Sequence, residues 1–262
     1  MPEPVFRLET HAISHIGMIR QLNEDRCYAD PARGVWAVAD GMGGHEAGDF
    51  ASDAIMRHLQ AAVTSAHSAA ELEAAFRAAI VNANGEIYAV SRQRGNTVIG
   101  STVVGLLTFG PHYRCYWSGD SRAYLLRGDV LTKLSRDHTE VQELMDRGVL
   151  TPEEAAVYPR RNAITHAIGV GPEAHMDYAD GEILPGDGFL LCSDGLTAHL
   201  NDMDIGHIMT GRRAPEICQE LVNLALSRGG TDNVTVNVVQ FFGKSSTVPA
   251  AGPVGEATRV VG

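Results

Sequence analysis

The fold of this 262-residue chain is constrained most strongly by a series of short apolar runs separated by turn signals. One long helical stretch follows the second run. The runs are rich in β-branched and aromatic residues, which favours strands. They cover 11–16, 35–39, 101–109, 112–118, 121–127, 188–193 and 233–241. Because strands and helices do not alternate strictly, a doubly wound parallel sheet is disfavoured. Tight turns such as "SGDSR" and "RGDV" favour antiparallel pairing instead.

Helices are expected between and after these strands. Residues 46–65 place apolar side chains at helical spacing, and a second helix is expected from Ser68, because Glu71 three residues later completes a capping box. The segment "TPEE" at 151–154 repeats this capping pattern. A further helix is expected over 214–228, and the order of elements predicts an α+β layered fold.

The overall charge and the cysteines exclude some classes of function. A net charge of −11 argues against nucleic-acid binding, because contacts with phosphates need a basic face. The four cysteines form no C-x-x-C pair, which is typical of a reducing compartment. With neither a signal-like start nor a membrane-spanning run, we expect a cytoplasmic protein with no membrane partner. The Pro/Gly-rich residues 243–262 are expected to form a flexible tail.

Acidic residues lie at several strand ends and in one turn between strands. They are Glu24, Asp25, Asp40, Asp120, Asp194 and Asp232. Each one alone is more often a turn former. Together they would repel one another and lose hydration, unless divalent cations such as Mg²⁺ or Mn²⁺ use their oxygens as ligands.

A pair of such cations suits phosphoryl transfer. Two cations about 3.5–4 Å apart can share a carboxylate and a water molecule, and clamp a phosphoryl group for in-line attack. The glycine after Asp40, Gly41, would let a backbone carbonyl reach the same site. Arg20, four residues before Glu24, would suit two phosphate oxygens, although a surface ion pair with the nearby acids is an equally simple interpretation.

At this point the chain resembles a known family. The segments "RQLNEDR", "VADGMGGHEAG", "GSTVVG", "SGDSRAYLLR", "LSRDHT", "CSDGL" and "GGTDNVTV" have the order and spacing of the bacterial type 2C, metal-dependent Ser/Thr protein phosphatases. The resemblance covers roughly residues 10–241. It implies a four-layer α-β-β-α sandwich, in which two antiparallel sheets are flanked by helices. It also implies a catalytic domain over 1–242 with a flap at about 139–170.

The resemblance also implies metal ligands. Asp40 would bridge two Mn²⁺ or Mg²⁺ ions, and the Gly41 carbonyl would bind one of them. Asp194 and Asp232 would hold the first ion, and Glu24 would hold the second. Asp120 matches, with Asp194, the position of a weaker third ion.

Other residues would act on the substrate. Asp25 would orient a water ligand, and Arg20 would bind the phosphate. Arg160 and Arg161 in the flap would bind a phosphopeptide. An equally good interpretation is that both are solvated loop arginines without a binding role. The segment "GST" at 100–102 and Asn233 would give structural support.

The function implied is hydrolysis of phosphoserine and phosphothreonine in proteins by a monomer. Its partners would be a bacterial Ser/Thr kinase and the substrates of that kinase. One departure concerns the general acid, because Met42 stands where the eukaryotic branch has a histidine. His45 is a weak substitute for it, and a water ligand of the metals is the alternative source of the proton.

Three alternatives compete with this interpretation. A serine esterase would use Ser121 of "GDS", but that motif lies in mid-chain and no Asp-x-x-His follows near the end. A pseudophosphatase that only binds phosphoproteins would be expected to lack metal carboxylates. A phosphatase of the haloacid dehalogenase type needs D-x-D, whereas Gly41 and Met42 follow Asp40.

Overall fold

The structure is a computed structural model that describes residues 6–43 and 47–243. The expected tail therefore lies outside the described residues, except for Gly243, and so does His45. Among the described helices, none combines the length and the hydropathy that crossing a membrane requires.

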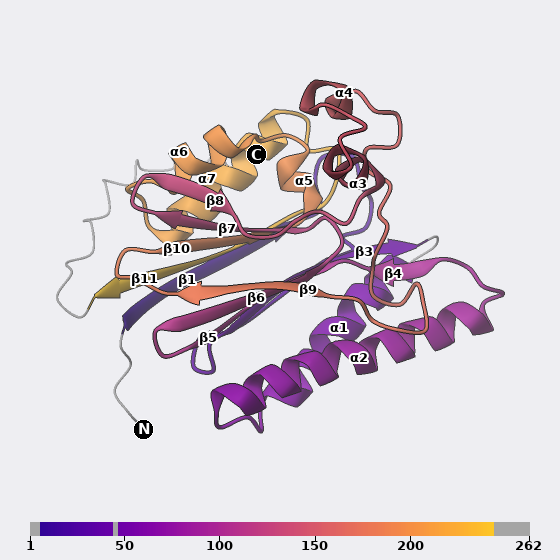
Figure 1. Cartoon of the computed structure of the whole chain (residues 1–262), viewed down its shortest axis with the longest axis horizontal. Coiled ribbons are helices and arrows are strands. Elements are labelled where there is room, and N and C mark those ends of the chain that lie inside the picture. The colour runs from indigo at the N-terminus through magenta and orange to yellow at the C-terminus, as the bar shows by residue number, and fades with distance from the viewer. Residues whose placement is uncertain (1–5, 44–46, 244–262) are drawn as a thin grey trace, which may run out of the picture.

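Two antiparallel sheets form the centre of the molecule (Figure 1). The first sheet has the order β1 (Phe6–His15), β11 (Val234–Gly243), β10 (Gly188–Cys192), β7 (Arg122–Arg127) and β8 (Val130–Lys133). The second has the order β2 (Asp25–Asp30), β3 (Val35–Gly43), β5 (Val103–Phe109), β6 (His112–Ser118) and β9 (Asp177–Glu182), with β4 (Ile99–Ser101) paired to β3.

Helices cover both outer faces of the sheets. The long helices α1 (Ala47–Val63) and α2 (Ala69–Gln93) pack on the second sheet. On the first sheet lie α5 (Asp194–Thr197), α6 (Asp202–Met209) and α7 (Ala214–Ser227). The short helices α3 (Glu140–Asp146) and α4 (Pro152–Ala156) stand at one end of the molecule, and they belong to the expected flap (Figure 1). The predicted four-layer sandwich is confirmed.

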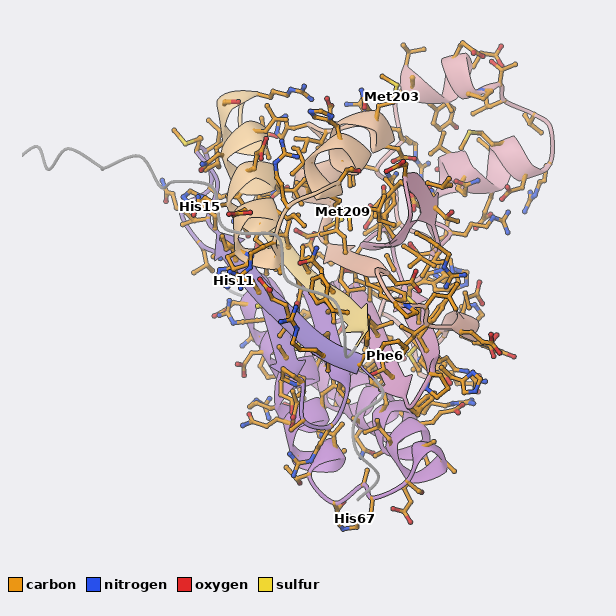
Figure 2. All side chains as sticks on the ribbon, turned by 90° about the vertical axis from the view of Figure 1, so that its left-hand side faces the viewer. Phe6, His11, His15, His67, Met203 and Met209 are labelled. Atoms are coloured by element: carbon orange, nitrogen blue, oxygen red, sulfur yellow. The ribbon has the colours of Figure 1, made fainter. Side chains whose placement is uncertain are left out.

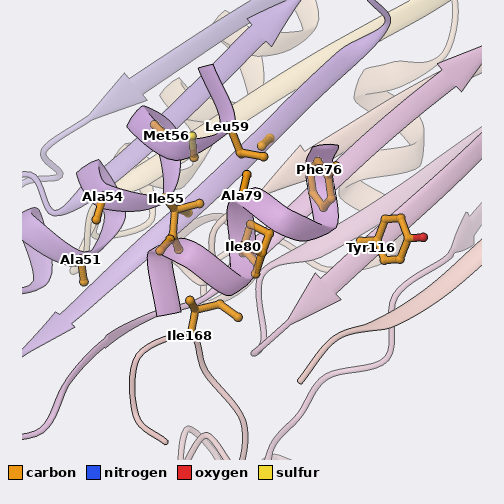
Figure 3. Close-up of a cluster of buried hydrophobic side chains, with 14 of the residues drawn as sticks. Ala51, Ala54, Ile55, Met56, Leu59, Phe76, Ala79, Ile80, Tyr116 and Ile168 are labelled. Atoms are coloured by element: carbon orange, nitrogen blue, oxygen red, sulfur yellow. The ribbon is translucent and has the colours of Figure 1, made fainter. Parts of the chain in front are cut away.

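Strand β3 shows how the sequence pattern builds these layers. Trp36 and Val38 pack in the core between the two sheets, whereas Ala37 and Ala39 face the helices on the other side. This alternation is the two-residue period of a strand that is buried on both faces. Phe76 of α2 stacks on Tyr116 of β6 with ring centroids 5.4 Å apart, in the core that Figure 3 shows.

The expected helix starts are observed. The Ser68 hydroxyl accepts a hydrogen bond from the Glu71 amide and begins α2, but the predicted capping box is incomplete, because the Glu71 carboxylate accepts the amide of His67 instead (2.8 Å). Thr151 forms a complete capping box with Glu154 at α4. The expected helices over 46–65 and 214–228 correspond to α1 and α7. These signals are local, so they can be recognised without tertiary contacts.

Several elements were not predicted. They are the strands β2, β8 and β9 and the helices α3, α5 and α6. Strand β9, "DYADGE", is acidic and mostly exposed at the edge of its sheet, so it has no apolar alternation to recognise. The predicted strand 101–109 is interrupted at Thr102, because the Thr102 amide donates instead to the carbonyl of Asp40 (2.8 Å).

Candidate active site

Acidic side chains from both sheets meet at one end of the sandwich. We call Glu24, Asp25, Asp40, Asp120, Asp194 and Asp232 the acidic cluster. Asp25 and Asp40 face each other in the register of β2 and β3. Asp194 begins α5 directly after β10, and Asp232 lies just before β11. Asp120 lies in the turn that crosses from β6 in one sheet to β7 in the other. The strand ends of two stacked sheets therefore bring these residues together.

A single cavity of about 280 Å³ joins most of the predicted site residues. It is lined by Arg20, Glu24, Asp40, Asp120, Asp194 and Asp232, together with Gly41 and Asn233. Asp25 is buried instead, with 1% of its surface exposed, and its Oδ2 accepts a hydrogen bond from the hydroxyl of Ser193 (2.7 Å). The structure thus places the expected ligands around one cavity, although their individual roles stay predictions.

Burial and mutual repulsion disfavour the charged forms of these carboxyls. Burial is the largest cause of the raised pKa of Asp40, followed by the charges of Asp25 and Asp194. Burial likewise raises the pKa of Asp25 to about 7 and that of Asp120 to about 7. Such a concentration of negative charge in a cavity attracts cations.

The donor set fits hard divalent cations. Oδ1 of Asp25 and Oδ1 of Asp120 are buried and have no hydrogen-bond partner among the described residues. Unpaired buried oxygens are costly, so their retention points to a ligand. Because every side-chain donor of the acidic cluster is a carboxylate oxygen, Mg²⁺ and Mn²⁺ suit it better than softer metals do.

Arg20 is a cation that the structure places against this cluster. Its Nη2 lies 2.6 Å from Oδ2 of Asp232, and its side chain remains about half exposed. This hydrogen bond is the main cause that raises the pKa of Arg20. An exposed guanidinium at the rim of the cavity can reach both a carboxylate and an incoming anion.

Gly41 is a position where backbone must come close to backbone. A Cβ atom there would lie 2.0 Å from the carbonyl oxygen of Gly48 and 2.9 Å from that of Glu24. The Gly41 amide also donates to the Glu24 carbonyl (3.2 Å). The glycine after Asp40 therefore holds strand β3 against the start of α1 and the loop that carries Glu24. Met42 lines the same cavity and offers no titratable proton.

Asp40 is held by the segment "GST" at 100–102. Oγ1 of Thr102 accepts the Asp40 amide (3.1 Å), and the hydroxyl of Ser101 donates to the Asp40 carbonyl (2.9 Å). Both groups act on the backbone of Asp40, so they orient its side chain without contacting it.

Asn233 holds the loop that carries Arg20 and Glu24. Its Oδ1 accepts the amide of Glu24 (2.8 Å). Its Nδ2 donates to the carbonyls of Ile16 (2.8 Å) and Leu22 (3.0 Å). One side chain therefore joins β11 to both ends of this loop.

Replacement of Asn233 by alanine is expected to lower the free energy of unfolding by about 2 kcal/mol, because three partly buried hydrogen bonds are lost. For a chain of this size the melting temperature should fall by roughly 4–8 °C. Thermal unfolding in EDTA, which removes any contribution from metals, measures this effect. Asn223→Ala is the matched control, since Asn223 is exposed on α7. Equal melting temperatures for the two variants would contradict the assignment.

The alternative of a serine nucleophile is not supported at Ser121. Its side chain is buried (1% exposed), and its hydroxyl lies 2.7 Å from that of Thr102. A nucleophilic serine needs an adjacent base and access to the substrate. Ser121 has a hydroxyl partner and a buried position instead.

The two flap arginines lie in different surroundings. Arg160 pairs with Glu140 (3.0 Å) and its side chain is 70% exposed. Arg161 lines a second cavity of about 450 Å³, which shares Asp120 and Asp194 with the first one. Neither arginine lines the cavity of Arg20 and Asp40, so the structure does not bring them into the acidic cluster.

Some residues around these cavities had no signal in the sequence. Asn162 and Ile164 line the first cavity from the flap segment. Arg122 lines the second, where its Nε and Nη2 bind the Asp137 carboxylate (3.0 and 2.6 Å). The motif "SGDSR" does contain Arg122, but only the folded chain shows that it faces this cavity.

Comparisons with known proteins agree with this arrangement. Residues 11–144 match the sequence profile of the family described as "Protein phosphatase 2C". The chain is 40% identical to the serine/threonine protein phosphatase PstP of Mycobacterium tuberculosis over 231 residues. The aligned region covers 87% of this chain and 44% of that protein. This chain therefore spans less than half the length of that relative. It is 36% identical to the serine/threonine phosphatase stp of Listeria innocua over 86% of this chain and 92% of that protein.

Solved structures share the fold. One of them is PppA, described as a key regulatory component of T6SS in Pseudomonas aeruginosa. It superposes with a TM-score of 0.82 at 40% sequence identity, and the match covers 90% of this chain and 98% of PppA. The catalytic domain of PstP in complex with two manganese ions superposes with a TM-score of 0.79 at 36% identity, over 90% of this chain and 98% of that domain.

Proposed function

The chain belongs to the protein phosphatase 2C family, and from this premise we propose that it hydrolyses phosphoserine and phosphothreonine in proteins with Mn²⁺ or Mg²⁺. The observation that carries the proposal is the cavity in which Arg20 meets the acidic cluster. The relatives named as serine/threonine phosphatases, and the manganese complex of one of them, support the same interpretation.

The residues that would hold two cations are those of the acidic cluster. Asp40 would be shared by both ions, and the Gly41 carbonyl would bind one of them. Asp194 and Asp232 would hold the first ion and Glu24 the second, while Asp120 and Asp194 offer a third position. When bound, the cations would lower the pKa of a water molecule and neutralise charge on the phosphoryl group.

The other side chains position the reactants. The free Oδ1 of Asp25 would accept a hydrogen bond from the attacking water, while Ser193 holds its other oxygen (2.7 Å). Arg20 would turn from Asp232 to the substrate phosphate, because Asp232 attracts the guanidinium less once its charge is shared with a cation. Met42 has no proton to give, so the leaving oxygen would take its proton from a water molecule in the cavity.

Metal dependence tests this proposal directly. The chain should hydrolyse a phosphothreonine peptide with Mn²⁺, lose that activity in excess EDTA, and regain it when Mn²⁺ is restored. Activity that survives EDTA and is blocked by a serine-reactive fluorophosphonate would favour the esterase alternative. Peptide binding without turnover, in folded protein that binds Mn²⁺, would favour a phosphoprotein-binding role.

Arg161 is proposed to contact the peptide around the phosphorylated residue, since it lines the cavity that adjoins the acidic cluster. Arg161→Ala should raise KM for a phosphopeptide by roughly three- to tenfold, because an exposed charge contact is worth about 1 kcal/mol. Its kcat for the small substrate p-nitrophenyl phosphate should not change. Arg160→Ala is the matched control, and an equal effect of both variants on KM would contradict a specific contact.

The cellular setting is part of the proposal. We infer that the protein opposes a Ser/Thr kinase and acts, as a monomer, on the proteins which that kinase phosphorylates. A cytoplasmic setting is supported by the cysteines, because all four of them are free thiols. Incubation of this chain with a kinase-phosphorylated lysate, followed by phosphoproteomics, would identify the substrates.

A further inference from the structure

A second group of possible metal ligands lies outside the acidic cluster. We call His138, His166, His175 and Asp177 the histidine cluster. His138 lies between β8 and α3, and His166 lies within the flap segment. Asp177 is the first residue of β9, next to β6, and His175 lies two residues before it. Four positions from three parts of the chain therefore come together at one edge of the second sheet.

The three imidazoles are close to one another. The ring centroid of His166 lies 4.4 Å from that of His175 and 5.1 Å from that of His138. The rings of His138 and His175 are 5.6 Å apart. Three imidazole rings can pack in this way without a ligand, but the carboxylate of Asp177 also contacts two of them, His138 and His175.

The donor atoms have the spacing of a tetrahedral site. Nε2 of His138 lies 3.2 Å from Oδ2 of Asp177, and Nε2 of His175 lies 3.5 Å from Oδ1. One donor atom from each of these three residues lies within 4.8 Å of the others. Zinc with bonds of about 2.0–2.1 Å to nitrogen and oxygen separates its ligand atoms by about 3.3 Å in a tetrahedron. The two contacts with Asp177 are close to this value, although they use different oxygens of the carboxylate.

We propose that the histidine cluster binds a transition-metal dication of the Zn²⁺ type. Its ligands would be His138, His175 and Asp177. His166, whose ring packs against both histidines, would become a fourth ligand only after its side chain moves toward them. Imidazole nitrogen suits Zn²⁺, whereas the all-carboxylate acidic cluster suits Mg²⁺ and Mn²⁺, so the two sites select different ions.

The site is connected to the acidic cluster through Gly119. The backbone amide of His138 donates to the carbonyl of Gly119 (2.9 Å), and Nδ1 of the His138 ring accepts a hydrogen bond from the Gly119 amide (3.3 Å). A metal at Nε2 would place the ring proton on Nδ1, facing that amide, so binding requires a small shift of Gly119. The neighbour of Gly119 is Asp120, which belongs to the acidic cluster.

Zinc titration of the full chain tests the proposal. The probe is Zn²⁺ in excess Mg²⁺, which supplies the acidic cluster with a hard cation. Calorimetry gives the affinity, and imidazole ¹⁵N resonances identify the histidines that bind. The test variants are His175→Gln and His166→Gln, since neither side chain is fully buried. His67→Gln is the control, because His67 is exposed in the turn between α1 and α2, at the lower end of the view in Figure 2, and is not one of the clustered histidines.

We expect the wild type to bind one equivalent of Zn²⁺ with shifts at His138, His166 and His175. Each test variant should bind it at least about tenfold more weakly, as the loss of a ligand group requires, and the control should match the wild type. Equal zinc affinity in the wild type and either test variant would overturn the proposal. Zinc uptake by the acidic cluster alone, with no imidazole shifts, would overturn it as well. The readout is binding, so it is independent of whether the chain is a phosphatase.

Discussion

Replacement of Asp40 by asparagine is expected to lower kcat/KM for a phosphothreonine peptide by about 10³-fold or more, which corresponds to about 4 kcal/mol of activation free energy. Asp40 lines the cavity with four other acidic cluster residues, and the proposal makes it the carboxylate that both cations share. An amide carries no negative charge, so it would hold two cations poorly. Activity assays over a range of Mn²⁺ concentrations measure both the loss and any weaker metal binding.

The same variant is expected to be more stable than the wild type when metals are removed. The Asp40 carboxyl is desolvated and surrounded by the charges of Asp25, Asp194, Asp120 and Asp232, so its ionised form costs free energy. Its neutralisation should raise the melting temperature in EDTA by roughly 2–6 °C, or about 1–2 kcal/mol. Asp129→Asn, in the exposed turn between β7 and β8, is the matched control for net charge. A variant that is fully active, or less stable than the wild type in EDTA, would contradict this role.

Replacement of Arg20 by alanine is expected to lower kcat/KM by about 10²-fold, because a charge-assisted contact with phosphate is worth roughly 2–3 kcal/mol. The loss should appear chiefly in KM, and the inhibition constant for inorganic phosphate should rise in parallel. Arg20→Lys keeps the charge but not the planar fork, so it should recover only part of the loss.

The control for Arg20 is Arg33→Ala, since Arg33 is also a partly exposed arginine paired with a single aspartate, Asp30. Because Arg20 also binds Asp232 (2.6 Å), calorimetry of Mn²⁺ binding is needed to separate a loss of phosphate binding from a disturbed ligand. Unchanged KM and unchanged phosphate inhibition in Arg20→Ala would show that Arg20 serves only the ion pair.

The local parts of the fold could be predicted because their signals are local. Ser68 and Thr151 cap helices through bonds to residues three positions away, and the apolar run 35–39 is buried on both faces. Strand β9 was missed because it has no apolar alternation. Helices α3 and α6 were missed although Thr139 and Asn201 cap them locally, because only seven and eight residues follow these caps and the apolar period is short. The resemblance to type 2C phosphatases is confirmed by the family match.

The sequence by itself determined which carboxylates end the strands, which glycine follows Asp40, and the family to which the chain belongs. Only the tertiary structure decided that Asp25 is buried beside Asp40, that Arg161 faces the adjoining cavity while Arg160 does not, and that two histidines, His138 and His175, contact Asp177. The physical reason is that capping and strand patterns depend on a few successive residues. The convergence of side chains depends on how two sheets stack and where the flap segment crosses their edge.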